Sequence, residues 1–171
     1  MNKSRHMVRM GLYVALLAIS AWMTVPAPVP FTMQTMAVLT IGALLGSGQG
    51  CICVGVYLLL GVIGVPVFSG FRGGVQVLLG PTGGYLLGFL LSAFVAGWAG
   101  KRFRSEWILA VCFAAAVLLC YGFGTLWYAL LYSGGELGAI LLTCVVPVLL
   151  PDALKIVLSL LLLRRLRTVI H

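Results

Sequence analysis

Residues 107–132 read WILAVCFAAAVLLCYGFGTLWYALLY and carry no charged side chain. Glu106 precedes the run, and Ser133, Gly134 and Gly135 follow it. A helix that crosses the hydrocarbon core of a bilayer needs about 20 consecutive, mostly apolar residues. The run is longer than this, so it predicts one membrane-spanning helix.

Two further stretches lack charge, one between Arg9 and Arg72 and the other between Arg72 and Lys101. The first is long enough for two or three spans and the second for one. Only 8% of the 171 residues are charged and 62% are hydrophobic, whereas a soluble domain usually carries about 25% charged residues. The composition therefore excludes a water-soluble globule and predicts an integral membrane protein.

Proline and glycine divide the apolar sequence into segments. Residues 26–30 read PAPVP, residues 46–50 read GSGQG, and residues 65–84 hold six glycines and two prolines. All three are expected to interrupt helices, and the last is expected to line a cavity, because irregular backbone at membrane depth must be shielded from lipid. We predict an all-α integral membrane protein in which residues 1–171 form one six-helix domain. The predicted helices cover residues 8–25, 31–45, 51–64, 85–100, 107–132 and 137–164.

Nine of the eleven basic residues lie in three short flanks. The flanks contain Lys3, Arg5 and Arg9; Lys101, Arg102 and Arg104; and Arg164, Arg165 and Arg167. Cytoplasmic segments beside spans are rich in Lys and Arg, so an even number of spans must separate any two flanks. Six spans satisfy this rule and place both termini in the cytoplasm. There is no aromatic-interleaved basic face of the kind that binds nucleic acid, so no nucleic-acid partner is expected.

Asp152 and Lys155 form the strongest local signal. Their spacing places them on one face of the last predicted helix, and Asp152 lies about 18 Å along that helix from Arg164, near the middle of the hydrocarbon. An ionised group at that depth costs roughly 2.5–3.5 kcal/mol or more, so the two residues are expected to face the bundle interior and to be paired. They form either a functional site or an ion pair that only fixes helix packing; we favour the functional interpretation.

Two weaker signals lie on the predicted outer side. Arg72 either anchors a loop at the membrane interface or binds a carboxylate. Thr32 and Gln34 supply neutral hydrogen-bonding groups beside the flat ring of Phe31, a mixture that suits a polar heterocycle. Alternatively, Thr32 only caps the start of a helix.

Helix one carries small residues on one face, at Gly11, Ala15 and Ala18. In lipid such a face permits close approach of another helix. The sequence alone leaves open whether that helix belongs to this chain or to another subunit.

No catalytic set, metal site or cofactor site is expected. The chain has three acidic residues, and its histidines, His6 and His171, lie outside the predicted helices. The five cysteines lie in apolar runs and are interpreted as packing residues, although the spacing of Cys51 and Cys53 leaves a metal pair as an alternative. Without a phosphate-binding loop, any uphill transport would take its energy from a partner.

Four stretches together carry a resemblance to a known family. They are residues 29–35 (VPFTMQT), 57–68 (YLLLGVIGVPVF), 80–89 (GPTGGYLLGF) and 151–155 (PDALK). In order and content they resemble the BioY family, the biotin-specific substrate-binding subunits of energy-coupling factor (ECF) transporters. The resemblance implies a multi-pass subunit of the cell membrane that binds biotin tightly from outside. It also implies a transmembrane coupling subunit and a cytoplasmic ATPase pair as partners.

The resemblance also implies roles for particular residues. Asp152 would accept hydrogen bonds from the ureido N–H groups of biotin, while Lys155 would donate to a biotin oxygen. Arg72 or the neighbouring glycine amides would hold the carboxylate, and the assignment of the two cations to the two ends of biotin stays open. The implied site contains Asp152, Lys155, Arg72, Phe31, Thr32, Gln34, Phe68, Gly73, Gly74 and Tyr85. The implied docking face for the coupling subunit contains Gly11, Ala15 and Ala18, with Ile19 where the family motif has alanine.

Three alternatives remain. The first is the same architecture serving riboflavin or thiamin, although those ligands favour more aromatic stacking than the sequence offers. A membrane-embedded enzyme would need a nucleophile or metal set near Asp152, and none is found. A purely structural subunit would tolerate apolar replacements of Asp152 and Lys155 together.

Overall fold

The computed structural model describes residues 3–25, 31–132 and 146–170. These residues form seven helices and a two-stranded antiparallel sheet. In chain order the elements are α1 (Lys3–Trp22), β1 (Thr24–Val25), β2 (Phe31–Thr32), α2 (Gln34–Leu45), α3 (Ser47–Val62), α4 (Val75–Leu79), α5 (Gly83–Arg102), α6 (Glu106–Leu131) and α8 (Val146–Ile170).

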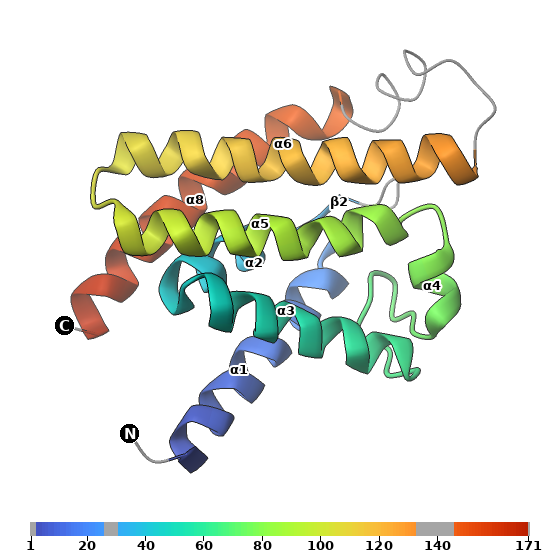
Figure 1. Ribbon diagram of the computed structural model, residues 1–171, viewed down its shortest axis with the longest axis horizontal. Helices are drawn as coiled ribbons and strands as arrows, with labels where there is room; N and C mark the ends of the chain where they lie inside the picture. Colours follow the sequence, from blue (N-terminus) through green and yellow to red (C-terminus); the bar gives the residue numbers. More distant parts are fainter. Residues whose placement is uncertain (1–2, 26–30, 133–145, 171) are drawn as a thin grey trace.

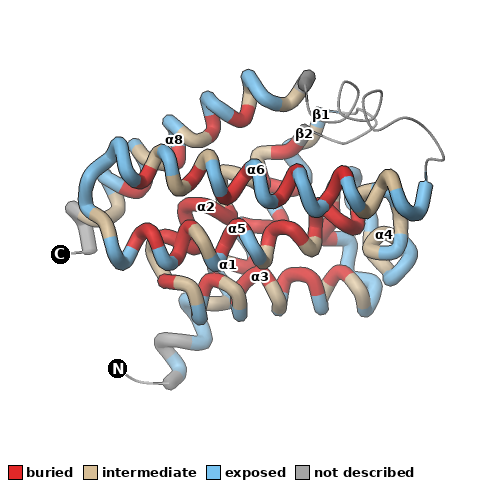
Figure 2. The backbone as a smooth tube through the Cα atoms, turned by 45° about the horizontal axis from the view of Figure 1, so that its top comes forward, coloured by how far each residue is buried: buried red, intermediate tan, exposed pale blue. Residues whose placement is uncertain are grey.

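Helix α5 lies at the centre of the bundle. It runs beside α6 and also packs against α2 and α3 (Figure 1), while α2 in turn contacts α1, α3 and α8. The inward faces of these helices are buried and their outer faces are exposed (Figure 2). Many exposed side chains are large and apolar, such as Leu130 at 75% exposure. Extensive apolar surface of this kind is expected where lipid surrounds the helices.

Glycines allow α5 to approach its neighbours closely. A Cβ atom added at Gly84 would lie 2.3 Å from the Cβ of Trp127 in α6, and one added at Gly97 would lie 2.4 Å from the backbone nitrogen of Ser47 in α3. Small residues at helix contacts are characteristic of packing in membranes. A larger residue at either position would push the helices apart.

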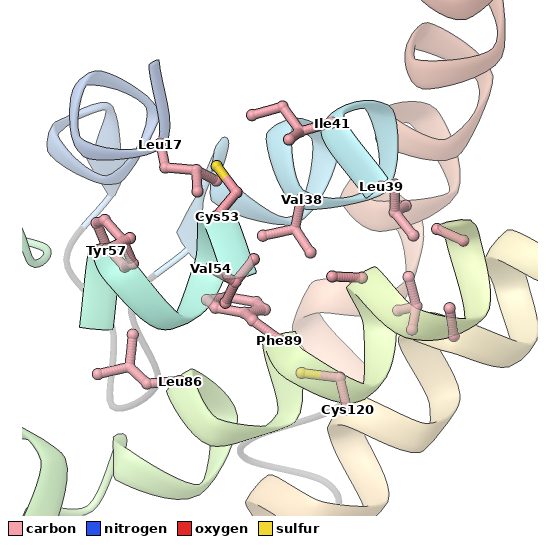
Figure 3. Close-up of a cluster of buried hydrophobic side chains, with 14 of the residues drawn as sticks. Leu17, Val38, Leu39, Ile41, Cys53, Val54, Tyr57, Leu86, Phe89 and Cys120 are labelled. Carbon is pink, nitrogen blue, oxygen red and sulfur yellow. The ribbon is translucent and has the colours of Figure 1, made fainter. Parts of the chain in front are cut away.

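The buried core joins side chains from α1, α2, α3, α5, α6 and α8. Figure 3 shows Leu17 of α1, Val38 of α2, Cys53 of α3, Phe89 of α5 and Cys120 of α6 within one apolar cluster. Cys53 and Cys120 are both buried there. The structure therefore gives these two cysteines a packing role, as the sequence predicts.

The first two predicted helices have different ends in the structure. α1 ends at Trp22, because Thr24 and Val25 pair with Thr32 and Phe31 in the small sheet. Val25 precedes a proline, and the residue before a proline is sterically biased away from helix. Consequently the helix predicted from residue 31 begins only at Gln34.

Other predicted boundaries also change. The predicted break at residues 46–50 shrinks to Gly46, whose positive φ of 90° turns the chain directly from α2 into α3. The short helix α4 lies inside the segment expected to be irregular. α8 begins at Val146 and continues past residue 164 to Ile170, and residues 137–145 of the last predicted helix lie outside the described residues.

By length and composition, α5 and α6 are the two helices of the described chain that qualify to cross a membrane. The apolar helices α2 and α3 have 12 and 16 residues, fewer than the roughly 20 of a full crossing. Both ends of the chain and the α5–α6 turn lie at the same end of the molecule (Figure 1). The three basic flanks are therefore brought to one end of the bundle.

Candidate functional site

A buried ion pair lies in α8. Asp152 and Lys155 are only 3% and 2% exposed, and Lys155 Nζ lies 2.6 Å from Asp152 Oδ1. The prediction that these two charges face the interior and are paired is confirmed. Removing a charge from water is expensive, so each member of such a pair requires the other.

The ion pair belongs to a polar network that links three helices. The hydroxyl of Tyr121 in α6 donates to Asp152 Oδ2, so both oxygens of the carboxylate are engaged. Ser159 Oγ donates to the carbonyl of Lys155 at 2.7 Å and lies 3.3 Å from the carbonyl oxygen of Met36 in α2. Sequence reasoning missed Tyr121 and Ser159, because a neutral hydroxyl does not interrupt an apolar run. Their one signal is a hydroxyl among apolar neighbours in the middle of a helix.

A cavity that is partly open to solvent lies beside β2, at the start of α2 and α5. The lining residues are Thr32, Gln34, Phe68, Ser69, Arg72, Val77, Thr82, Tyr85, Leu86 and Phe89. Five of these were expected from the sequence, namely Thr32, Gln34, Phe68, Arg72 and Tyr85. The glycine- and proline-rich segment contributes part of the lining, as predicted.

Gln34 offers an uncommitted donor to this cavity. The residue is 2% exposed, and its side-chain Nε2 makes no hydrogen bond with the residues that the structure describes. Its backbone nitrogen donates to Thr32 Oγ1 at 3.4 Å, while the N-cap position of α2 is Met33, which makes no side-chain capping bond. A buried donor without an acceptor costs about 1–3 kcal/mol. A ligand oxygen that accepts from Gln34 would recover that free energy.

Arg72 places a cation at the same cavity. Its Nε donates to the carbonyl of Ser69 at 3.1 Å, while its two terminal nitrogens make no hydrogen bond within the described part of the chain. The side chain is exposed and lines the cavity. A guanidinium with free terminal N–H groups is suited to bind a carboxylate.

The segment that carries Arg72 is attached to the end of α1. Trp22 Nε1 donates to the carbonyl of Pro66 at 3.0 Å, and the Trp22 ring stacks on Phe71 with centroids 4.9 Å apart. Ser69 Oγ donates to Thr24 Oγ1 at 2.9 Å. These contacts hold one side of the cavity in place.

The apolar walls are fixed by packing. Phe68 is 1% exposed, meets Tyr57 edge-on with ring centroids 5.6 Å apart, and occupies the space above Gly61, where an added Cβ would lie 2.0 Å from the ring. The Tyr85 hydroxyl lies 3.2 Å from Thr125 Oγ1. Figure 3 shows Phe89 of α5 next to the helix that carries Tyr57.

Asp152 and Lys155 are not among the residues that line the cavity. Their carboxylate and ammonium contact each other, and the carboxylate also accepts a hydrogen bond from Tyr121, which does not line the cavity either.

Three further residues belong to the predicted site, namely Gly73, Gly74 and Phe31. The Gly74 amide donates to the carbonyl of Gly61 at 2.7 Å, so it is already engaged within the chain, and its role in holding a carboxylate stays a prediction. Gly73 packs on backbone, because a Cβ there would lie 2.5 Å from the carbonyl oxygen of Val65. Neither glycine lines the cavity. The backbone of Phe31 lies in β2, whereas its side chain is outside the described part of the structure.

The small residues of α1 line a groove against α3. Gly11 and Ala15 are exposed, whereas Ala18 is 6% exposed and belongs to the core. The outer part of this face is therefore open to another helix, and its inner part is filled by this chain.

A model of the BioY family matches residues 1–171. The chain is 46% identical over 108 residues to a protein named biotin transporter BioY from Thermotoga maritima, an alignment that covers 62% of this chain and 64% of that protein. It is 34% identical over 166 residues to a probable biotin transporter BioY from Pyrococcus horikoshii, covering 96% of this chain and 98% of that one.

The fold is also that of a solved structure. It is a crystal structure of the S-component for biotin from an ECF-type ABC transporter, and it is 28% identical to this chain. The TM-score is 0.88, and the match covers 98% of this chain and 95% of the other.

Proposed function

The chain belongs to the BioY family, and from this premise we propose that it takes up biotin as the substrate-binding subunit of an energy-coupling factor transporter. It is a membrane protein and a transport subunit rather than an enzyme. The proposal is carried by a family match over the whole chain, and the cavity adds uncommitted donors at Gln34 and Arg72.

The chemistry of biotin matches the polar groups around the cavity. Its ureido ring has two N–H donors and one carbonyl acceptor, and its tail ends in a carboxylate. In our assignment Arg72 holds the carboxylate, and Gln34 donates to the ureido carbonyl. Phe68 and Tyr85 supply apolar walls, joined by Phe31.

Asp152 and Lys155 are assigned to the ureido end. Biotin entering from the cavity would displace Tyr121 from Asp152, which would then accept a ureido N–H, while Lys155 would donate to the ureido oxygen beside it. Without ligand the two charges neutralise each other across 2.6 Å. The exchange keeps every buried charge paired at each stage, which the low dielectric of the interior requires.

We further assign six spans, with both termini facing the cytoplasm and the cavity facing outward. The basic flanks support this orientation, because they lie at one end of the bundle (Figure 1) and cytoplasmic segments favour Lys and Arg. The exposed small residues Gly11 and Ala15 would contact the coupling subunit, with Ala18 packed behind them. A cytoplasmic ATPase pair would supply the energy.

The test is equilibrium binding of labelled biotin to the purified, detergent-solubilised chain. Wild type should bind tightly, and Asp152→Asn should bind at least about tenfold more weakly, because charged hydrogen bonds to the ligand are lost. Glu106→Gln is the matched control, since it removes one carboxylate that is exposed at the basic end and should leave binding unchanged. A folded wild-type chain that does not bind biotin would refute the proposal. Binding of riboflavin or thiamin by such a chain would assign the subunit to another vitamin.

A further inference from the structure

A second groove lies at the basic end of the bundle, where the start of α6 meets the end of α8. It is open to solvent, and its lining residues are remote in sequence from those of the cavity described above. Its lining residues are Arg104, Glu106, Leu109, Leu160, Leu163, Arg164 and Arg167. None of these residues is used in the proposed uptake of biotin.

The rim of the groove carries more positive than negative charge. The lining includes three arginines and one carboxylate. Arg164 Nη1 lies 3.4 Å from Glu106 Oε1, and both side chains are exposed. Arg167 donates to the carbonyl of Gly100, and burial, followed by the nearby guanidinium of Arg104, lowers its pKa. Like charges held this close repel each other, so an anion between Arg104 and Arg167 would stabilise both. The start of α6 adds the partial positive charge of a helix N-terminus.

The floor of the groove is apolar. Leu109 and Leu163 are 2% and 1% exposed, and Leu160 is half-buried between the helices. Next to the groove, Trp107 is 84% exposed, and exposed tryptophan with arginine is typical of the membrane–water interface. A small soluble anion needs only the cationic rim, whereas a phospholipid uses both rim and floor.

We propose that this groove binds one anionic phospholipid of the phosphatidylglycerol class. The phosphate lies between Arg104 and Arg167, and an acyl chain follows the seam between α6 and α8 past Leu160. The proposal rests on the membrane orientation given above, because the cytoplasmic leaflet is the one rich in anionic lipid and basic pockets between helices on that side bind such headgroups. The bound lipid would hold the α5–α6 turn against the end of α8.

The experiment measures lipid retention by the purified full-length chain with native mass spectrometry. The probes are dioleoyl phosphatidylglycerol, dioleoyl phosphatidylcholine and inorganic phosphate. Wild type should retain phosphatidylglycerol at least about tenfold better than phosphatidylcholine, and Arg104→Gln with Arg167→Gln should abolish that preference. The matched control, Arg102→Gln with Arg165→Gln, removes the same charge from the same end outside the groove and should keep it.

Several outcomes would overturn the proposal. Equal loss in the two double variants would mean diffuse attraction by surface charge, and binding of inorganic phosphate as strong as that of the lipid would mean a soluble-anion site. Biotin binding by the same samples checks folding and tests the uptake function separately. If the Arg104 and Arg167 variant fails to fold, Leu160→Trp fills the groove with all charges kept. It should reduce lipid retention by a similar factor, and unchanged retention would refute the site.

Discussion

Replacement of Asp152 by asparagine gives the sharpest test of the buried pair. The substitution keeps the size of the side chain but removes the charge that lies 2.6 Å from Lys155 Nζ. Because Lys155 is 2% exposed, its ammonium cannot be solvated instead. Breaking a buried ion pair costs about 3–5 kcal/mol, which in a chain of this size corresponds to a melting temperature lowered by roughly 6–20 °C. Tyr121→Phe, which removes one hydrogen bond to the carboxylate, should cost less, about 1.5–3 kcal/mol.

A double variant separates stability from binding. Asp152→Asn combined with Lys155→Met removes both charges, and apolar replacement of a whole buried pair is often neutral or stabilising. We therefore expect the melting temperature to recover to near that of the wild type, while biotin binding stays lost. Thermal unfolding and biotin titration on the same detergent samples measure both quantities.

Two results would refute this reasoning. If Asp152→Asn melts at the wild-type temperature, the pair does not depend on mutual neutralisation. If the double variant binds biotin with wild-type affinity, the pair is only a packing element and its place in the binding site is wrong.

Three more outcomes are expected from other parts of the fold. Gly97→Ala should lower the free energy of unfolding by about 1–3 kcal/mol through overpacking against α3, whereas Gly55→Ala, where an added Cβ meets nothing within 4 Å, should be neutral or stabilising. Arg72→Gln should weaken binding of biotin at least about tenfold and leave that of biotin methyl ester unchanged in titrations. Ala15→Leu should abolish co-purification with the coupling subunit but keep biotin binding, while the exposed control Leu12→Ala should keep both.

The helices could be predicted from sequence because charge is expensive in lipid. The charge-free runs located α5 and α6 to within a few residues, and a three-residue spacing was enough to predict the contact between Asp152 and Lys155. The small β1–β2 sheet and α4 were not predictable in the same way. They depend on backbone hydrogen bonds of short segments, which leave no periodic pattern of apolar residues.

The candidate site was predictable only in part, because its members come together through tertiary contacts. Gln34 and Arg72 share a cavity since Trp22 and Thr24 hold the intervening segment in place. No local pattern encodes that attachment. Tyr121 was missed because a neutral hydroxyl within an apolar run resembles any aromatic packing residue.

The attachment of the Arg72 segment to α1 has a consequence for transport. Trp22 is the last residue of α1, whose middle presents Gly11 and Ala15, so one helix joins the wall of the candidate cavity to the proposed docking face. Any tilt of α1 on docking is transmitted to Pro66 and Phe71. Thermodynamic linkage then demands reciprocity: the factor by which the coupling subunit changes the affinity for biotin equals the factor by which biotin changes the affinity for the coupling subunit.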